Sequence, residues 1–208
     1  RGLIPFLAAG DPSLDVTEQL VHEFAARGAD VVELGVPFSD PLADGPSMQA
    51  SSFRALQKGA TVPRVFETVA TIRAECEVPL VLMTYYNPVQ KYGVARFAAD
   101  AASAGADGVI LTDLPFEEAG DWKSAADKAG LATIQLIAPT STKDRIEMGA
   151  KMASGFVYCV SRTGVTGARS DAPVELDSLV RSIRAASDLP VAVGFGVSTP
   201  DQVRGIAR

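Results

Sequence analysis

Cysteine and histidine are scarce in this chain of 208 residues, which contains two cysteines and one histidine. Cys76 follows a helical stretch and Cys159 lies within an apolar run, so both are interpreted as structural, reduced thiols rather than as a disulfide framework. The single histidine, His22, excludes a histidine-rich metal site. Without a plausible nucleophile–histidine pair, a serine or cysteine hydrolase is also disfavoured.

An excess of basic residues and long apolar runs are missing as well. The 19 lysines and arginines are outnumbered by 25 aspartates and glutamates, so no basic patch for nucleic acid or for an anionic membrane is predicted. No apolar run approaches the ~18 residues that a membrane-spanning helix requires, and no charged-then-apolar leader is found. We therefore expect a cytoplasmic protein.

Short apolar runs instead alternate with longer amphipathic stretches. The runs are nearly all apolar, which is the pattern of a parallel strand buried on both faces. They span residues 3–8, 31–36, 79–83, 108–111, 133–137, 156–160 and 191–193. The helical stretches between them include residues 17–26, 65–75, 94–104, 117–128, 176–186 and 200–206. Gly28 and Gly105 each follow a helical stretch, where a glycine can take the left-handed conformation that ends a helix.

Strict alternation of strands and helices leaves two architectures, an open doubly wound sheet or a closed barrel. No Gly-x-Gly-x-x-Gly turn follows the first strand, and polar loops follow the carboxyl ends of strands, so the barrel is favoured. We expect an α/β protein with a (β/α)₈ TIM-barrel fold, a single domain over residues 1–208 with seven βα units visible. Because a full barrel runs to about 250 residues, the last strand and helix are expected to be missing, with truncation at both ends.

Glu33 is the most informative residue because it lies within an otherwise apolar strand. An ionised carboxylate is costly to desolvate there, and few structural roles offset that cost. Pairing with an arginine on a neighbouring strand, or a place in a polar layer of the barrel, is the structural alternative. A functional carboxylate is favoured over both.

Asp44 lies in a loop rich in proline, glycine and small residues, just past the end of the same strand. Taken alone, Asp44 is best explained as a turn aspartate before Gly45. Paired with Glu33 it gains a second interpretation, because two carboxylates in different environments can hold different protonation states. General acid and general base catalysis require that difference.

The run 33–46, Glu-Leu-Gly-Val-Pro-Phe-Ser-Asp-Pro-Leu-Ala-Asp-Gly-Pro, resembles the tryptophan synthase α-subunit family, and so does the run 5–12. The runs 158–167 and 194–198 are similar to later motifs of the same family, in the same order. The resemblance covers the whole chain, and the first string is very specific.

The resemblance implies a (β/α)₈ lyase that cleaves indole-3-glycerol phosphate to indole and glyceraldehyde 3-phosphate in tryptophan biosynthesis. In the family, indole then passes through a tunnel to a β subunit within an α₂β₂ heterotetramer. Pyridoxal phosphate is implied only in that β subunit, so no cofactor and no metal are expected in this chain.

Matched by motif, the resemblance implies that Glu33 is the general acid–base and that Asp44 is the partner of the indole nitrogen. Tyr158 matches a catalytic tyrosine of the family, although a buried tyrosine with one hydrogen-bonded hydroxyl explains it equally well. Phe6 matches an indole-facing position, for which a core phenylalanine is the simpler interpretation. Asp113, after the fourth strand, matches a polar position of the family that supports the residues of the site without itself contacting the substrate.

Gly167, Phe195 and Gly196 match the phosphate-binding end of the family's site. Glycines let backbone N–H groups approach an anion closely, and barrels often hold phosphate after their last strands. By the same resemblance, Thr166 is placed to touch Asp44. The glycine–serine pair that completes the cradle in the family would follow Arg208, so an incomplete phosphate site is expected in this sequence.

Three functions remain open on the sequence. The first is a catalytic α subunit in an α₂β₂ assembly, and the second is a stand-alone lyase that releases free indole. The third is a regulatory or binding subunit of the β chain that turns over poorly alone. The presence of both Glu33 and Asp44 favours a chemically competent site over a silent module.

Overall fold

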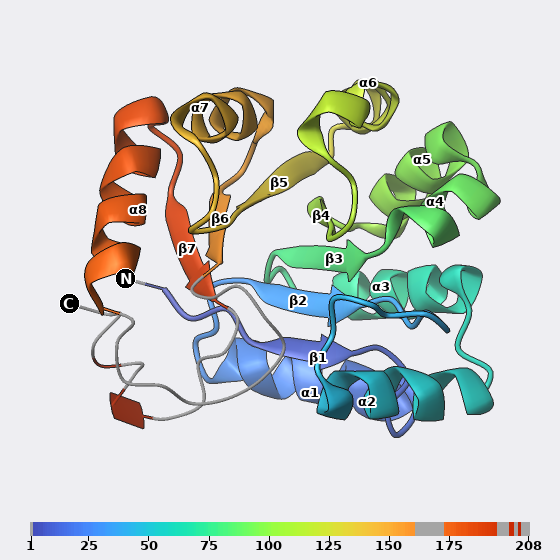
Figure 1. Cartoon of the computed structure of the whole chain (residues 1–208). Helices are drawn as coiled ribbons and strands as arrows, with labels where there is room; N and C mark the ends of the chain where they lie inside the picture. Colours follow the sequence, from blue (N-terminus) through green and yellow to red (C-terminus); the bar gives the residue numbers. More distant parts are fainter. Residues whose placement is uncertain (1, 161–172, 195–199, 202–203, 205–208) are drawn as a thin grey trace. The chain divides into compact units, whose positions relative to one another are not determined.

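A computed structural model describes residues 2–160, 173–194, 200, 201 and 204. The chain forms two compact units, Gly2–Ala132 and Thr133–Arg208. In both units strands alternate with helices along the sequence, as the colour gradient of Figure 1 shows. This alternation confirms the predicted α/β class.

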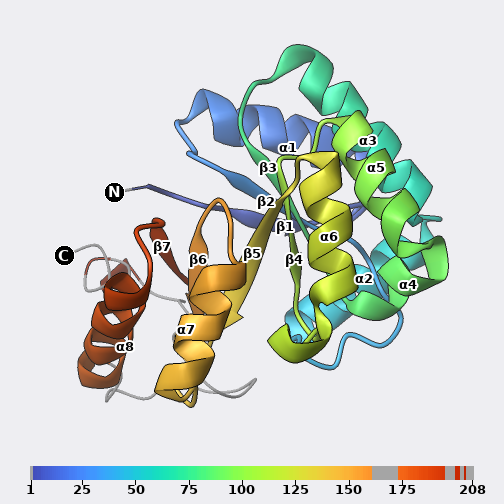
Figure 2. The same ribbon diagram turned by 90° about the horizontal axis from the view of Figure 1, so that it is seen from above.

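The first unit contains four parallel strands that are hydrogen-bonded in sequence order. They are β1 (Phe6–Ala8), β2 (Val32–Gly35), β3 (Leu80–Thr84) and β4 (Gly108–Leu111). The helical segments are α1 (Leu14–Ala26), α2 (Pro46–Gln57), α3 (Val62–Glu75), α4 (Tyr86–Tyr92), α5 (Val94–Ala104), the 3₁₀ helix η1 (Phe116–Glu118) and α6 (Gly120–Ala129). Helices α1, α3, α5 and α6 follow one another in a row along the strands (Figure 2).

The two faces of the β1–β4 strands bury different side chains. Successive residues of a strand point to opposite faces. Val32 and Leu34 of β2, and Leu80 and Leu82 of β3, belong to the apolar core that these strands share with the helices. Glu33 lies between two of these residues, so its side chain points to the opposite face of the strands.

The second unit contains three parallel strands, again hydrogen-bonded in sequence order. Strand β5 (Ala132–Ile137) begins at the unit's boundary and is followed by α7 (Lys143–Met152), β6 (Val157–Val160), α8 (Pro173–Ala186) and β7 (Val191–Gly194). Helices α7 and α8 pack against each other. Val157 and Cys159 are fully buried, whereas Tyr158 is half-buried because it points to the other face of β6.

The strand prediction is confirmed for the seven apolar runs, although β1 is shorter than expected and begins at Phe6. Gly28 and Gly105 have positive φ values of 84° and 98° where their helices end, as predicted. Three helices were not predicted: α2, α4 and α7. The predicted helix over 117–128 is divided into η1 and α6, and the one over 200–206 lies mostly outside the described residues.

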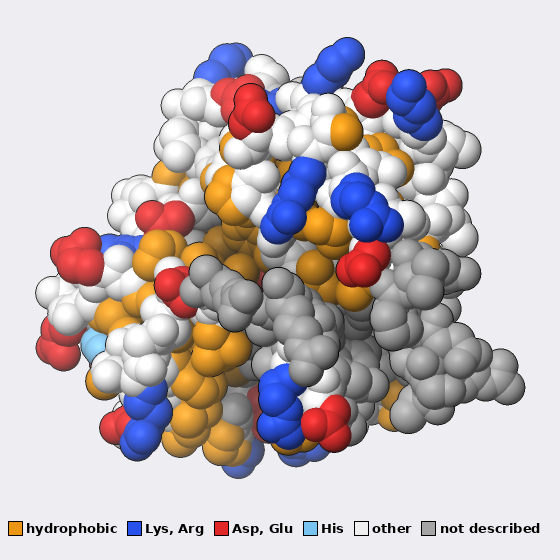
Figure 3. All heavy atoms as spheres, turned by 90° about the vertical axis from the view of Figure 1, so that its left-hand side faces the viewer, with side chains coloured by type: hydrophobic (Ala, Val, Ile, Leu, Met, Phe, Trp, Pro, Cys, Tyr) orange, Lys and Arg blue, Asp and Glu red, His pale blue; other side chains and the backbone are white. Residues whose placement is uncertain are grey.

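Within the part of the chain that the structure describes, no helix is long and apolar enough to cross a membrane. On the face drawn in Figure 3, the described acidic and basic side chains are interspersed rather than gathered by sign. Cys76 and Cys159 are both free thiols. Burial raises the pKa of Cys159 to about 11, so this thiol stays protonated and unreactive at neutral pH.

Candidate active site

Glu33 is buried on the face of β2 that points away from the helices. Its side chain is 1 % exposed, and its Oε1 has no hydrogen-bond partner among the described residues. The backbone around it is regular, since its N–H donates to the carbonyl of Pro5 at 2.9 Å and its register partners are Phe6 and Val81. A rigid strand therefore holds a carboxyl group that makes no ion pair with any residue the structure describes, which argues against an arginine partner on a neighbouring described strand.

Burial sets the ionisation of Glu33. Desolvation raises the pKa of this carboxyl from its usual 4.5 to about 7, because the charged form is disfavoured away from water. Near neutral pH the two protonation states are then similarly populated. A group of this kind can both give and take a proton, as a general acid–base must.

Phe6 lies beside Glu33 and packs over Gly35. A Cβ atom at Gly35 would lie 2.6 Å from Cζ of Phe6, so only a glycine leaves room for the ring in this position. The ring is 37 % exposed, which is unusual for a phenylalanine on a strand. An aromatic surface next to a buried carboxyl suits the binding of a flat, apolar ring, rather than the core role that the sequence alone favoured.

Asp44 is fixed by hydrogen bonds of its backbone. Its N–H donates to the carbonyl of Pro41 at 3.0 Å, and its carbonyl accepts from Nε2 of Gln49 at 2.9 Å. Helix α2 starts two residues later at Pro46, with Gly45 as its N-cap. Burial raises the pKa of the half-buried Asp44 carboxyl, although a hydrogen bond from the Tyr85 hydroxyl acts in the opposite direction.

Tyr85 is a residue beside the Asp44 loop that the sequence did not reveal. It lies between β3 and α4, is 5 % exposed, and its hydroxyl accepts a hydrogen bond from the backbone N–H of Ala43 at 2.9 Å. Its ring packs on Phe38, with ring centroids 5.4 Å apart. Tyr85 and Ala43 are 42 residues apart in sequence, so no local pattern predicts this contact.

A second group of contacts anchors the helix that follows Asp44. Arg54 of α2 donates to both carboxylate oxygens of Asp11, at 2.9 and 2.6 Å, and Ser51 donates to the same carboxylate. Arg54 is the main cause of the lowered pKa of Asp11. Asp11 follows β1, so this bidentate pair connects the loop after β1 to α2, the helix that directly follows the Asp44 loop.

Asp113 supports the neighbourhood of Tyr85 rather than facing Glu33. Its Oδ1 accepts a hydrogen bond of 2.6 Å from the backbone N–H of Tyr86, the first residue of α4. A carboxylate at a helix N-terminus satisfies one of the free N–H groups and is favoured by the helix dipole. Asp113 thus fixes the position at which Tyr85 enters α4, which fits the supporting role expected from the resemblance.

Tyr158 belongs to the second unit, where its side chain lies against β7. A Cβ atom placed at Gly194 would be 2.0 Å from the Tyr158 hydroxyl and 2.6 Å from its Cζ. Its ring also lies near Phe156, with centroids 6.1 Å apart. The absence of a side chain at Gly194 therefore determines where the Tyr158 hydroxyl lies.

This close approach gives a testable expectation for Gly194→Ala. The added methyl group must displace the Tyr158 ring or the backbone of β7, and overpacking of this kind typically costs about 1–3 kcal/mol. We expect the free energy of unfolding in urea to fall by that amount. Gly120→Ala is the matched control, because a Cβ at Gly120 would meet no atom within 4 Å. Equal stability of the two variants would contradict the proposed contact.

The other predicted site residues, Thr166, Gly167, Phe195 and Gly196, lie outside the described residues. Among the residues that are described, no group of three or more histidine, cysteine, aspartate or glutamate side chains could hold a metal ion. The candidate site therefore consists of Glu33 with Phe6 on the strands, and of Asp44 with Tyr85 at the following loop.

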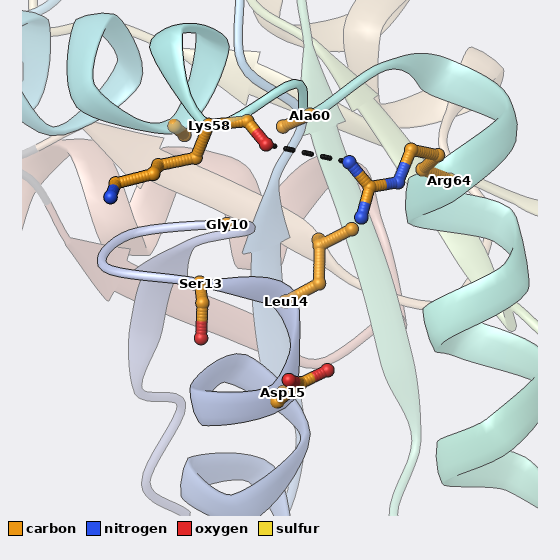
Figure 4. A pocket seen from close by; sticks show the side chains of 8 residues that line it. Gly10, Ser13, Leu14, Asp15, Lys58, Ala60 and Arg64 are labelled. Atoms are coloured by element: carbon orange, nitrogen blue, oxygen red, sulfur yellow. Dashed lines mark hydrogen bonds between the residues drawn. The ribbon is translucent and has the colours of Figure 1, made fainter.

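A small pocket of about 140 Å³ lies elsewhere, between the start of α1 and the α2–α3 turn. Lys58 and Arg64 are its basic residues. Figure 4 shows that they do not converge on a common point, because the guanidinium of Arg64 is turned to the carbonyl of Lys58 and the Lys58 ammonium points away. Glu33 and Asp44 therefore remain the candidate catalytic groups, and no chemistry is placed in this pocket.

The βα repeat defines the α/β-barrel class, and a buried carboxyl whose Oε1 has no partner among the described residues is a group suited to acid–base chemistry. A family profile described as "Tryptophan synthase alpha chain" matches residues 1–208. The chain belongs to the tryptophan synthase alpha chain family, a family of lyases in tryptophan biosynthesis.

Individual relatives agree with this assignment. The chain is 55 % identical over 207 residues to the tryptophan synthase alpha chain of Geobacter sulfurreducens, which covers 100 % of this chain and 78 % of the relative. The corresponding protein of Geotalea daltonii is 52 % identical with the same coverage.

Solved structures show the same fold. The tryptophan synthase α₂β₂ complex from Pyrococcus furiosus contains a chain that matches with a TM-score of 0.91 at 40 % identity, over 99 % of this chain and 82 % of that chain. Subunit alpha from Legionella pneumophila matches with a TM-score of 0.89 at 38 % identity, over 100 % and 77 %. The fold class is thus the α/β TIM barrel of this family, as predicted.

Proposed function

We propose that this protein is a catalytic α subunit of tryptophan synthase, which cleaves indole-3-glycerol phosphate to indole and glyceraldehyde 3-phosphate by a retro-aldol reaction. The observation that carries this proposal is Glu33, a buried carboxyl with a pKa of about 7, whose Oε1 has no hydrogen-bond partner among the described residues. A silent regulatory subunit has no need for a carboxyl that costs stability.

Glu33 acts as the general acid–base. Cleavage of the carbon–carbon bond requires a proton on the indole ring carbon that bears the side chain, and removal of the proton from the adjacent hydroxyl. The neutral acid donates the first proton, and the resulting carboxylate accepts the second as the aldehyde forms. A pKa near neutrality allows one group to do both, because neither form is strongly disfavoured.

Asp44 stabilises the charge that develops on the ring nitrogen. Protonation of the ring carbon makes this nitrogen cationic, and a carboxylate that accepts its N–H lowers the energy of that state. Phe6 offers its exposed ring as a surface for the indole, and Tyr158 contributes a hydroxyl as a third catalytic residue. Asp113 supports the site through α4.

The phosphate end of the substrate is assigned to the residues matched by motif: Thr166, Gly167, Phe195 and Gly196. Backbone N–H groups at the glycines would hold the phosphate. We also propose that residues 1–208 form a single barrel domain and that the protein works in the cytoplasm.

The proposed partner is a tryptophan synthase β subunit in an α₂β₂ heterotetramer. The Pyrococcus furiosus relative was solved as an α₂β₂ complex with mutual activation of its subunits. We propose that pyridoxal phosphate is bound only by the β subunit and that this chain needs no cofactor of its own, since acid–base groups suffice for the retro-aldol step.

Indole release tests the proposal directly. The protein is incubated with indole-3-glycerol phosphate, alone and with a matching β subunit, and the indole and glyceraldehyde 3-phosphate that form are measured. Cleavage by the protein alone should yield the two products in equal amounts. We expect slow cleavage by the protein alone and faster cleavage in the complex. Full activity without any affinity for the β subunit would show a stand-alone lyase. Tight binding to the β subunit without cleavage in either sample would show a regulatory subunit.

A further inference from the structure

Tyr85 contacts the loop between β2 and α2 at two points. Its ring packs on Phe38 near the start of the loop, at 5.4 Å between centroids, and its hydroxyl accepts from the N–H of Ala43 at 2.9 Å. The side chain is 5 % exposed, so these contacts are made away from bulk water. Tyr85 therefore joins β3 to both ends of the segment that leads to Asp44.

The same hydroxyl also acts on the carboxyl of Asp44, because it binds the N–H of Ala43, the residue directly before Asp44, and a hydrogen bond from it lowers the pKa of Asp44. A phenol has one proton to donate and two lone pairs to accept with, so it can accept from Ala43 and donate to Asp44 at once. Burial, followed by the negative charge of Asp44, raises the pKa of Tyr85 to about 12. The phenol thus keeps its proton at neutral and moderately alkaline pH, and remains a donor.

The other charged groups nearby are engaged elsewhere. On the Asp44 loop itself, Asp40 accepts a hydrogen bond from Ser39 at 2.5 Å. Asp113, on the loop after β4, accepts from the backbone of Tyr86, and the first turn of α2 contains no acidic residue. Glu33 is the remaining carboxyl of the site, and it lies within β2. Among the described residues, the Tyr85 hydroxyl is the group that, besides burial, changes the pKa of Asp44.

We propose that Tyr85 is a positioning residue of the active site, whose hydroxyl holds the Asp44 carboxylate in place to accept the ring N–H of the substrate. This inference rests on the proposed function of Asp44. Two contacts made by one buried side chain carry it, with Phe38 through the ring and with Ala43, the residue before Asp44, through an acceptor lone pair. The effect of the hydroxyl on the Asp44 carboxyl agrees with them. Asp113 contributes by fixing the backbone at Tyr86, next to Tyr85.

Tyr85→Phe separates the hydroxyl from the ring. The phenylalanine keeps the contact with Phe38 and loses only the hydrogen bonds. Without its donor, Asp44 binds a proton more tightly. The acidic limb of the kcat/KM profile should therefore shift to higher pH by about one pH unit, the scale of one hydrogen bond to a charged group. The loss should therefore be about tenfold in the acidic range and should shrink as the pH is raised.

Tyr92→Phe is the matched control. Tyr92 ends α4, and its hydroxyl donates to Asp100 at 2.6 Å, so this variant also loses a tyrosine–aspartate hydrogen bond but leaves the Asp44 loop unchanged. Its pH profile should coincide with that of the unsubstituted protein. A loss in Tyr85→Phe that is the same at every pH would overturn the proposal, because a purely structural role predicts that result.

A second readout is independent of turnover. Carbon-13 NMR of aspartate carboxyl groups, with Asp44 assigned through Asp44→Asn, measures the pKa of Asp44 in the unsubstituted protein and in Tyr85→Phe. We expect a higher pKa of Asp44 in the variant. If the unsubstituted protein forms no indole but the pKa of Asp44 is higher in Tyr85→Phe, the proposed function is wrong while the interaction of Tyr85 with Asp44 is supported. If indole forms and the pKa of Asp44 is unchanged, the role of Tyr85 is wrong.

Discussion

Replacing Glu33 with glutamine should lower indole formation by about 100-fold or more, the scale on which a lost acid–base group slows a reaction. Glutamine has nearly the same shape, so the strand and the face it lies on are preserved. Its amide cannot deliver a proton to the ring carbon or accept one from the hydroxyl. The measurement is kcat for cleavage of indole-3-glycerol phosphate, because the group acts in the transition state rather than in substrate binding.

Glu75→Gln is a suitable control for this substitution. Glu75 is exposed at the end of α3, outside the candidate site, so the same change of chemistry there should leave kcat unchanged. In the unsubstituted protein, kcat/KM should change with pH around 7, where Glu33 titrates. Near-normal cleavage by a folded Glu33→Gln variant would remove Glu33 from the mechanism.

The same substitution should make the protein more stable at high pH. The pKa of Glu33 is raised from 4.5 to about 7 in the folded state, so the folded protein binds this proton more tightly than the unfolded chain does. The stability cost is absent below the unfolded pKa, grows as the pH rises, and is complete above about 7. It amounts to about 3 kcal/mol at pH 8 and about 1 kcal/mol at pH 5.

Urea unfolding at pH 5 and at pH 8 measures this cost. All other carboxyl groups titrate alike in the two proteins, so the difference in free energy of unfolding between Glu33→Gln and the unsubstituted protein isolates Glu33. That difference should be larger at pH 8 than at pH 5. A difference that does not vary with pH would mean that the carboxyl is hydrated or partnered in solution. Loss of activity with a gain of stability is the combination expected of a strained catalytic group.

The sequence predicted the strands well because buried parallel strands have an unmistakable composition. It also identified Glu33, since a carboxylate among Val32 and Leu34 breaks the apolar pattern. The three missed helices lack the signal on which the prediction relied. Helix α7 is dominated by charged residues, α2 begins with a serine-rich, weakly amphipathic stretch, and α4 contains Pro88. Pro88 is tolerated because it lies in the first turn, where its missing N–H would have no partner within the helix.

The contacts around Asp44 could not be predicted in the same way. Tyr85 reaches the Asp44 loop from the end of β3, and Asp113 reaches the backbone of Tyr86 from the loop after β4. Both contacts depend on the pairing of strands far apart in sequence. In the sequence, Tyr85 is one of two consecutive tyrosines, and nothing distinguishes it from Tyr86. Asp44 likewise has the context of an ordinary turn, and only the folded loop reveals the partner of its carboxyl group.

The division of β1–β4 into two faces has a practical consequence for redesign. The helix-facing residues carry the apolar packing of the first unit, whereas the opposite face contains Glu33 together with Val81 and Met83 of β3. A library that varies Val81 and Met83 and keeps Glu33 would alter the shape of the surface next to this buried carboxyl while the helix contacts remain. New substrates can therefore be sought on this scaffold without first rebuilding its core.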